Sequence, residues 1–194
     1  MSARVDGTWL RSGTRAAARA RRARALLLGS VGLVFATVVA MSCALYVWPA
    51  ADRPTRVDAV LSLDGANEVA RMRTAVNLVT EGYAPVLLFS RGAYGSEPCP
   101  RLARVKVVCF IPRPARTVGE IAFAAHYAAV RGWRSLMVVP GHTQATRARL
   151  LLARCFKGRA VVVPGPPPPV VELPYAVAYE WAATLKALLV DRGC

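Results

Sequence analysis

The chain lacks the short motifs that identify several common classes of enzyme. It contains no G-x-G-x-x-G and no G-x-x-x-x-G-K-[ST] sequence, so dinucleotide and nucleoside-triphosphate sites have no local support. It contains no G-x-S-x-G sequence, the nucleophile turn of α/β-hydrolases. No C-x-x-C pair occurs, and the two histidines, His126 and His142, are not spaced as metal ligands. We therefore expect no metal site.

Acidic residues and lysine are also scarce. The 194 residues include 26 Lys and Arg but only 11 Asp and Glu, and Lys occurs three times. The part after residue 48 has 19 Lys and Arg against 10 Asp and Glu, a net charge of +9. Such a surface favours anionic partners, although the abundance of Arg, Ala, Val and Pro also matches the coding bias of a high-GC genome.

Charge is wholly missing from residues 26–48, a run of 23 positions. About 20 apolar residues in a helix cross the ~30 Å hydrocarbon core of a bilayer, so we expect one transmembrane helix. Positive charge stays on the cytoplasmic side, which predicts a single-pass plasma-membrane protein with its N-terminus inside. The Arg residues before the run, opposed only by Asp6, are Arg4, Arg11, Arg15, Arg19, Arg21, Arg22 and Arg24.

Two alternatives to an anchor stay open. Ser42-Cys43-Ala44 is a candidate cleavage site for a signal peptide, and Ala40-Met41-Ser42-Cys43 partly matches a lipoprotein box. All three interpretations export the same domain, so nucleic acid is not an expected partner. The expected organisation is a basic arm (1–25), the membrane helix (26–48), a linker (49–55) and one α/β domain (56–194).

Four cysteines fall in the exported part, where an oxidising compartment favours disulfides. Three pairings of Cys99, Cys109, Cys155 and Cys194 are open. Cys99–Cys109 is favoured because it closes a short local loop, and Cys155–Cys194 is the second pair.

From residue 56 onward, apolar runs alternate with segments of helical periodicity. Strands are predicted at 57–63, 85–90, 105–111, 135–140 and 159–164, and helices at 67–81, 117–132, 143–156 and 174–191. The last helix is expected to turn Val177, Trp181, Leu185 and Leu188 inward. Residues 164–169 are predicted to be a polyproline linker. Apolar strands separated by helices indicate a parallel sheet covered on both faces.

Ligands of such sheets bind beyond the carboxyl ends of the strands. The strand-end turns here are Asp64-Gly65, Ser90-Arg91-Gly92 and Pro140-Gly141. Thr117 and Glu120 fit a capping box at the start of a helix, an explanation that leaves anion binding open. Arg147 is predicted in the first turn of another helix, where the helix dipole opposes a cation, so it either holds an anion or is solvated.

Four segments together resemble the YdcF/SanA/ElyC-like family, also termed domain of unknown function 218. They are VDAVLSLDGA with the following Arg71, LLFSRG, PRPARTVGEIAFAA and VVPGHTQATRARLLLARCF, and they span about residues 56–165. The resemblance implies a Rossmann-like three-layer α/β/α sandwich with a mostly parallel sheet. It implies these ligand-binding residues: Gly65, Arg71, Ser90, Gly92, Thr117, Gln144 and Arg147. Asp64 and Glu120 are the candidates for proton transfer.

The sequence departs from the family pattern at several of these positions. Gln144 stands where the family has a histidine, Pro140 replaces a threonine, and Asp64 and Arg91 each replace a glycine. Because Gln cannot transfer protons at physiological pH, binding can survive at this position where catalysis does not.

We therefore expect a membrane-anchored envelope protein that acts in cell-envelope or cell-wall biogenesis. It would bind or process an anionic phosphate-bearing small molecule or a lipid-linked precursor. The alternatives are a non-catalytic scaffold module that binds such a ligand or another envelope protein, and a transferase that uses S-adenosylmethionine or a nucleotide. No cofactor is identified by the sequence.

Overall fold

The computed structural model describes residues 8–65, 68–91 and 98–194, with side chains from residue 21 onward. The chain divides into two units, Met1–Met41 and Ser42–Cys194. The described part of the first unit belongs to helix α1, which runs from Thr8 to Ser42. The π-helical segment η1, Cys43–Val47, lies at the start of the second unit.

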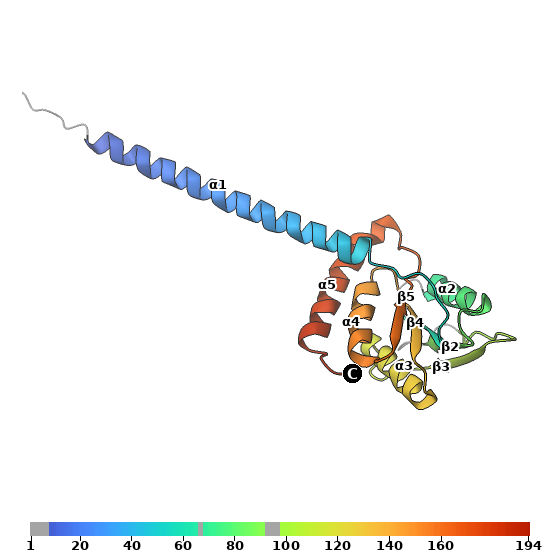
Figure 1. The fold of residues 1–194 in the computed structure, drawn as a ribbon. Helices are drawn as coiled ribbons and strands as arrows, with labels where there is room; N and C mark the ends of the chain where they lie inside the picture. The colour runs from blue at the N-terminus through green and yellow to red at the C-terminus, as the bar shows by residue number, and fades with distance from the viewer. Residues whose placement is uncertain (1–7, 66–67, 92–97) are drawn as a thin grey trace, which may run out of the picture. The chain divides into compact units, whose positions relative to one another are not determined.

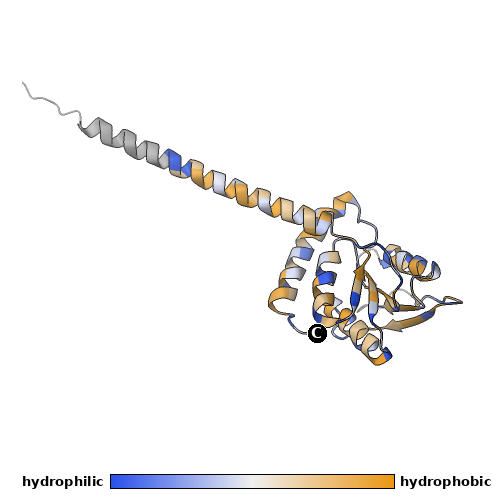
Figure 2. Cartoon of the chain, viewed as in Figure 1, coloured by the Kyte–Doolittle hydropathy of each residue, from blue (hydrophilic) through white to orange (hydrophobic). Residues whose placement is uncertain are grey.

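The segment Arg21–Val47 is long and apolar enough to cross a membrane, although a signal sequence would meet the same criterion. Figure 2 shows hydrophilic residues at the start of the coloured part of this helix and mostly hydrophobic residues along the rest. Two disulfides are formed, Cys99–Cys109 and Cys155–Cys194. Both predicted pairings are thus confirmed. An apolar N-terminal helix and two disulfides together indicate an extracytoplasmic domain.

The second unit has a five-stranded sheet with all neighbouring strands parallel, in the order β3-β2-β1-β4-β5 (Figure 1). This confirms the predicted α/β fold. The strands are β1 (Ala59–Ser62), β2 (Val86–Ser90), β3 (Lys106–Phe110), β4 (Ser135–Val139) and β5 (Arg159–Val162). The helices are α2 (Glu68–Thr80), α3 (Thr117–Arg131), α4 (Ala145–Cys155), the 3₁₀ turn η2 (Val170–Glu172) and α5 (Leu173–Leu189).

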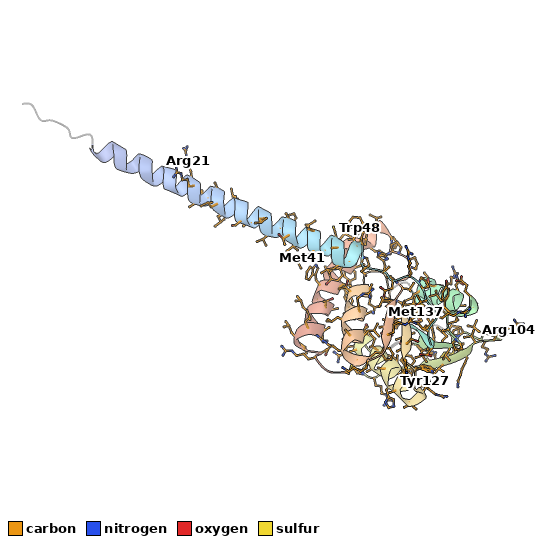
Figure 3. All side chains as sticks on the ribbon, viewed as in Figure 1. Arg21, Met41, Trp48, Arg104, Tyr127 and Met137 are labelled. Carbon is orange, nitrogen blue, oxygen red and sulfur yellow. A yellow bond between two sulfur atoms is a disulfide. The ribbon has the colours of Figure 1, made fainter. Side chains whose placement is uncertain are left out.

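Side chains alternate between the two faces of the sheet, as strand geometry requires. Leu61, Leu88 and Val138 belong to the core under α3 and α4. Val60, Leu87 and Met137 belong to a second core under α2. Figure 3 shows Met137 within the sheet and Tyr127 on α3 outside it. Because both faces are covered, the strands are apolar except at one terminal residue each, which made them recognisable in the sequence.

The last helix is rotated relative to the sequence prediction. Its buried residues are Glu180, Thr184 and Ala187, whereas Leu185 and Leu188 are exposed and Val177 and Trp181 are half-buried. The predicted inward face is therefore wrong. The residues of α5 itself are apolar on almost all sides of the helix. Hydrophobic periodicity therefore could not show which side faces the core.

The strand order places the reversal of the sheet between β1 and β4. The chain leaves β1 toward α2 on one face and leaves β4 toward α4 on the other, so the loops after these strands diverge. In open parallel sheets this point, at the carboxyl edge, is where ligands bind.

Candidate functional site

A cavity of about 820 Å³ lies at the carboxyl edge of the sheet. Its floor comes from the loops after β1 and β4, namely Asp64-Gly65 and Gly141–Gln144. Its walls come from the starts of α3 and α4, from the proline-rich segment 165–168, and from η2 and α5. The volume falls in the range of about 300–1,000 Å³ that small-molecule sites occupy.

Arg71 of α2 is the largest polar side chain buried at this edge. It is 2 % exposed, and its Nη2 donates a hydrogen bond to the Gly65 carbonyl oxygen at 2.8 Å. A Cβ atom at Gly141 would lie 3.2 Å from Arg71 Nη1, and one at Gly165 would lie 3.6 Å from Arg71 Cβ. The glycine at position 141 thus leaves room for the guanidinium, whereas the distance at Gly165 is an ordinary contact.

Burial lowers the pKa of the Arg71 guanidinium, and nearby carboxylates, first Glu120 and then Asp64, partly offset that effect. Arg71 is the residue that the family resemblance placed in the first helix. The structure brings it to the predicted edge of the sheet.

Glu120 of α3 points to the ends of β1 and β2. It is 2 % exposed, its Oε1 accepts a hydrogen bond from the Asp64 backbone N–H at 2.6 Å, and the Ser90 hydroxyl bonds to its carboxyl group. Burial raises the pKa of Glu120 to about 7, because the hydrogen bonds only partly compensate for lost hydration. A buried carboxyl with this pKa can exchange protons near neutral pH.

The capping box predicted for Thr117 and Glu120 is wrong. The N-cap of α3 is Arg116, so Thr117 is the first helical residue, and the structure shows no side-chain hydrogen bond at the cap. Both side chains face the cavity instead. The pattern T-x-x-E was real, but its register relative to the helix start was one residue off.

Arg147 of α4 is held by an acid that sequence reasoning missed. Its Nε and Nη2 each donate to a carboxylate oxygen of Glu180 at 2.9 Å, and its Nη1 donates to Thr117 Oγ1 at 2.7 Å. Burial lowers the pKa of Arg147, but the hydrogen bonds and charge of Glu180 outweigh burial and raise it overall. The anion that offsets the unfavourable position of Arg147 in the first helical turn is thus Glu180 of the same chain.

Glu180 had one signal in the sequence. It is one of only two charged residues in α5, with Lys186, in an otherwise apolar and alanine-rich helix. An acid in such a helix needs a buried partner, but nothing local identifies which arginine supplies it.

Gln144 holds the loop after β4 in place by two side-chain hydrogen bonds. Its Oε1 accepts a hydrogen bond from the Gly141 backbone N–H at 3.0 Å, and its Nε2 donates to Thr117 Oγ1 at 2.8 Å. Thr117 Oγ1 therefore accepts from both Gln144 and Arg147. Because both lone pairs are engaged, this hydroxyl can meet a ligand only as a donor.

The end of the apolar N-terminal segment contacts the rim of the cavity. His142 Nε2 lies 3.0 Å from the Val47 carbonyl oxygen, and Nδ1 lies 3.4 Å from the Gly165 carbonyl oxygen. His142 therefore ties η1 to the proline-rich segment, which wraps the cavity. The sequence had identified His142 only as one of two histidines that are not spaced as metal ligands.

The described part of the chain places seven of the predicted site residues at the cavity: Asp64, Gly65, Arg71, Thr117, Glu120, Gln144 and Arg147. Ser90 does not line the cavity but is fully buried beside Glu120. Gly92 lies outside the described residues. Arg149 is not part of the site, because its Nη1 pairs with Asp52 at 2.9 Å.

A scan of the chain against protein-family models finds no match. A search of curated proteins finds no match either. The resemblance to the YdcF-like family accordingly stays a prediction. Among the residues that the structure describes, no group of three or more His, Cys, Asp or Glu is arranged to hold a metal ion.

Proposed function

We propose that the protein is a membrane-anchored, extracytoplasmic envelope protein whose cavity binds and processes a phosphate-bearing metabolite, free or lipid-linked. One observation supports this most strongly. Glu120, a buried carboxyl with a pKa of about 7, lies in a ligand-sized cavity beside the buried guanidinium of Arg71. A group half-protonated near pH 7 serves as general acid or base, and the adjacent cation stabilises developing negative charge.

Asp64 and Glu172 also line the cavity, but its remaining hydrogen-bond donors suit a ligand rich in acceptor oxygens. Thr117 can act only as a donor, and the second amide hydrogen of Gln144 and the remaining Arg147 hydrogens are also donors. Phosphate offers several strong acceptors to such a set. Arg71 would supply the cation for such a ligand, because Arg147 pairs with Glu180 and Arg116 pairs with Asp191 at 3.0 Å.

The contacts of η1 support an uncleaved anchor. Trp181 Nε1 donates to Ser42 Oγ at 2.9 Å, and Tyr46, which is fully buried, packs edge-on against the Trp181 ring at 5.4 Å. Cleavage after Ala44 would remove Ser42 and the helical turn that supports Tyr46. An anchor that keeps these residues preserves both contacts.

A non-catalytic binding module is the second candidate. Gln144 occupies the family's histidine position and uses both ends of its amide to brace the loop, and Arg147 is already neutralised. A transferase that uses S-adenosylmethionine or a nucleotide gains no support from these contacts.

The test is ligand capture by the full chain in lipid nanodiscs, read as thermal stabilisation by polyprenyl phosphates, phosphorylated sugars, nucleotides and S-adenosylmethionine. A ligand at a hundred times its dissociation constant adds about 2.7 kcal/mol. We expect a phosphate-bearing ligand to stabilise the wild type and Arg73→Gln, but not Arg71→Gln. Arg73 is the matched control, because it is exposed on the same helix and its replacement removes the same charge.

Glu120→Gln separates the two candidate functions. An enzyme is expected to lose turnover in this variant while it still binds the ligand. A ligand bound without product by wild type and variant alike would favour the binding module. No stabilisation by any phosphate-bearing compound would refute the proposal.

A further inference from the structure

The last helix is an unusually apolar surface element. Leu173–Leu189 contains only two charged residues, and one of them, Glu180, is buried. By contrast α4, of 11 residues, carries Arg147, Arg149 and Arg154. A helix that is apolar nearly all round yet lies at the surface of a domain indicates a partner or a membrane.

We define the α5 face as the exposed apolar residues of η2 and α5. Val170, Val171 and Tyr175 are 80 %, 88 % and 78 % exposed, and the others are half or more exposed or close to it. The rings of Tyr175 and Tyr179 stack with a centroid distance of 6.5 Å. The face consists of Val170, Val171, Tyr175, Tyr179, Leu185, Leu188 and Leu189.

The contacts of α5 indicate what covers this face. Trp181, on the same helix, bonds to Ser42 and packs on Tyr46, and both of these residues belong to the candidate membrane span Arg21–Val47. His142 contacts Val47 and lines the same cavity as Val171 and Tyr175. The helix that carries the α5 face thus packs against the last residues of the apolar segment through Trp181.

The length of the apolar helix indicates which of its residues lies at the outer membrane surface. About 20 residues, at a rise of about 1.5 Å each, cross a ~30 Å hydrocarbon core. Counted from Arg24, the last charged residue before the apolar run, 20 residues end at Ala44. Ala44 lies in η1, between the two residues that Trp181 contacts. The helix α5 is therefore held where the chain leaves the bilayer.

We propose that the α5 face rests on the outer leaflet of the membrane that the N-terminal helix enters, with Tyr175 and Tyr179 at the headgroup level. Tyrosine is enriched at this depth because its ring is apolar and its hydroxyl is polar. Val171, Tyr175 and Tyr179 also line the cavity, so the cavity opens at the lipid surface. The inference rests on the anchored state proposed above and is independent of the cavity's chemistry.

The test places a fluorescent reporter on the α5 face of the full chain in phosphatidylcholine–phosphatidylglycerol nanodiscs. Val171→Trp is compared with Val130→Trp, whose site at the end of α3 is 70 % exposed and near the start of β4, at the opposite edge of the sheet. Lipids brominated high in the acyl chain quench indole that reaches the bilayer. We expect the emission added by Val171→Trp to be quenched and that added by Val130→Trp to be unaffected.

Equal responses at the two positions would overturn the proposal. The proposal would also be overturned if the emission of Val171→Trp shifted with the number of protein copies per nanodisc and was not quenched by brominated lipid. That result would indicate that a second copy of the chain covers the α5 face. Flotation of the chain with vesicles is measured in parallel. A chain that floats but shows no quenching refutes the docking alone, whereas a chain that does not float refutes the anchor as well.

Discussion

Two carboxylates at opposite edges of the sheet have opposite properties. Asp58 precedes β1 at the amino edge, where its Oδ2 accepts hydrogen bonds from Arg134 N, Ser135 N and Ser135 Oγ at 2.9, 2.8 and 2.8 Å. Burial alone would raise the pKa of Asp58, but these hydrogen bonds outweigh it, so the pKa is lowered. At the carboxyl edge burial dominates, and the pKa of Glu120 is raised.

The difference separates a structural acid from a candidate catalytic one. Asp58 joins two strands and has its charge satisfied by backbone and side-chain donors, so it is stable as an anion. Glu120 faces a cavity with fewer donors, so its charged form is disfavoured, which costs stability. A fold tolerates such a group where function needs it.

Glu180 offers the largest expected effect, because it is a buried carboxylate whose two oxygens both accept hydrogen bonds from Arg147. In Arg147→Met the acid would lose its bidentate guanidinium, and we expect the free energy of unfolding to fall by about 3–5 kcal/mol. Urea denaturation measures the loss. The added substitution Glu180→Gln is expected to recover part of it.

The control for this effect is Arg116→Met, which removes the pair with Asp191. The Arg116 side chain is 45 % exposed, so water screens the pair and we expect a loss of no more than about 1 kcal/mol. Similar losses in the two variants would show that burial of the Arg147–Glu180 pair has no special weight.

Glu120→Gln is expected to have a somewhat smaller effect that depends on pH. Because the pKa of Glu120 rises from 4.5 unfolded to about 7 folded, the unfolded state releases its proton first as pH rises. The wild type should therefore lose about 3 kcal/mol of stability between those values, a loss that persists at higher pH. The variant lacks this loss, so it should gain on the wild type from pH 4.5 to pH 7.

Chemical denaturation of both proteins across that pH range measures the effect. The lowered pKa of Asp52 and Asp58 acts below pH 4 and does not overlap with this window. A stability difference that stays constant from pH 4.5 to pH 7 would contradict the raised pKa.

A smaller effect than at Glu120 is expected at the other carboxylate of the comparison, Asp58. Asp58→Asn exchanges a charged acceptor of three hydrogen bonds for a neutral one, which should cost about 1–2 kcal/mol at neutral pH. Since the pKa of Asp58 is lowered from 3.8, its contribution is complete above that value and is lost as pH falls through the folded pKa. Denaturation at pH 7 and pH 3 should show the cost shrinking in acid. A cost that is larger at pH 3 would contradict this assignment.

The fold was predictable because its strands are buried on both faces. Runs such as residues 85–90 carry no polar residue until Ser90, and only a parallel sheet between helices accommodates several of them. The disulfides were predictable from the even cysteine count and the short spacing of Cys99 and Cys109. The facing of α5 was not, because nearly every side of that helix is apolar.

The site was predictable in position but not in its internal pairing. Strand-end loops identified Asp64, since topology alone places these loops at one edge. Glu120, which lies in α3, was identified by the T-x-x-E pattern and by the family resemblance. The hydrogen-bonded ion pair between Arg147 and Glu180 joins residues 33 positions apart on different helices. No local sequence pattern predicts a pairing over such a separation. Thr117 was misread for a related reason, because a side chain at a helix start can turn toward its own backbone or toward a neighbouring helix.

The most direct test of Glu120 as the candidate proton-transfer group is the titration of its own carboxyl group. Infrared difference spectra of the full chain, compared with Glu120→Gln, isolate the carbonyl stretch of the protonated Glu120 side chain. We expect this band to disappear with a midpoint near pH 7, as its raised pKa requires. A midpoint near the ordinary value of 4.5 would show that Glu120 is an ordinary anion, and the proposed proton transfer in the cavity would be refuted.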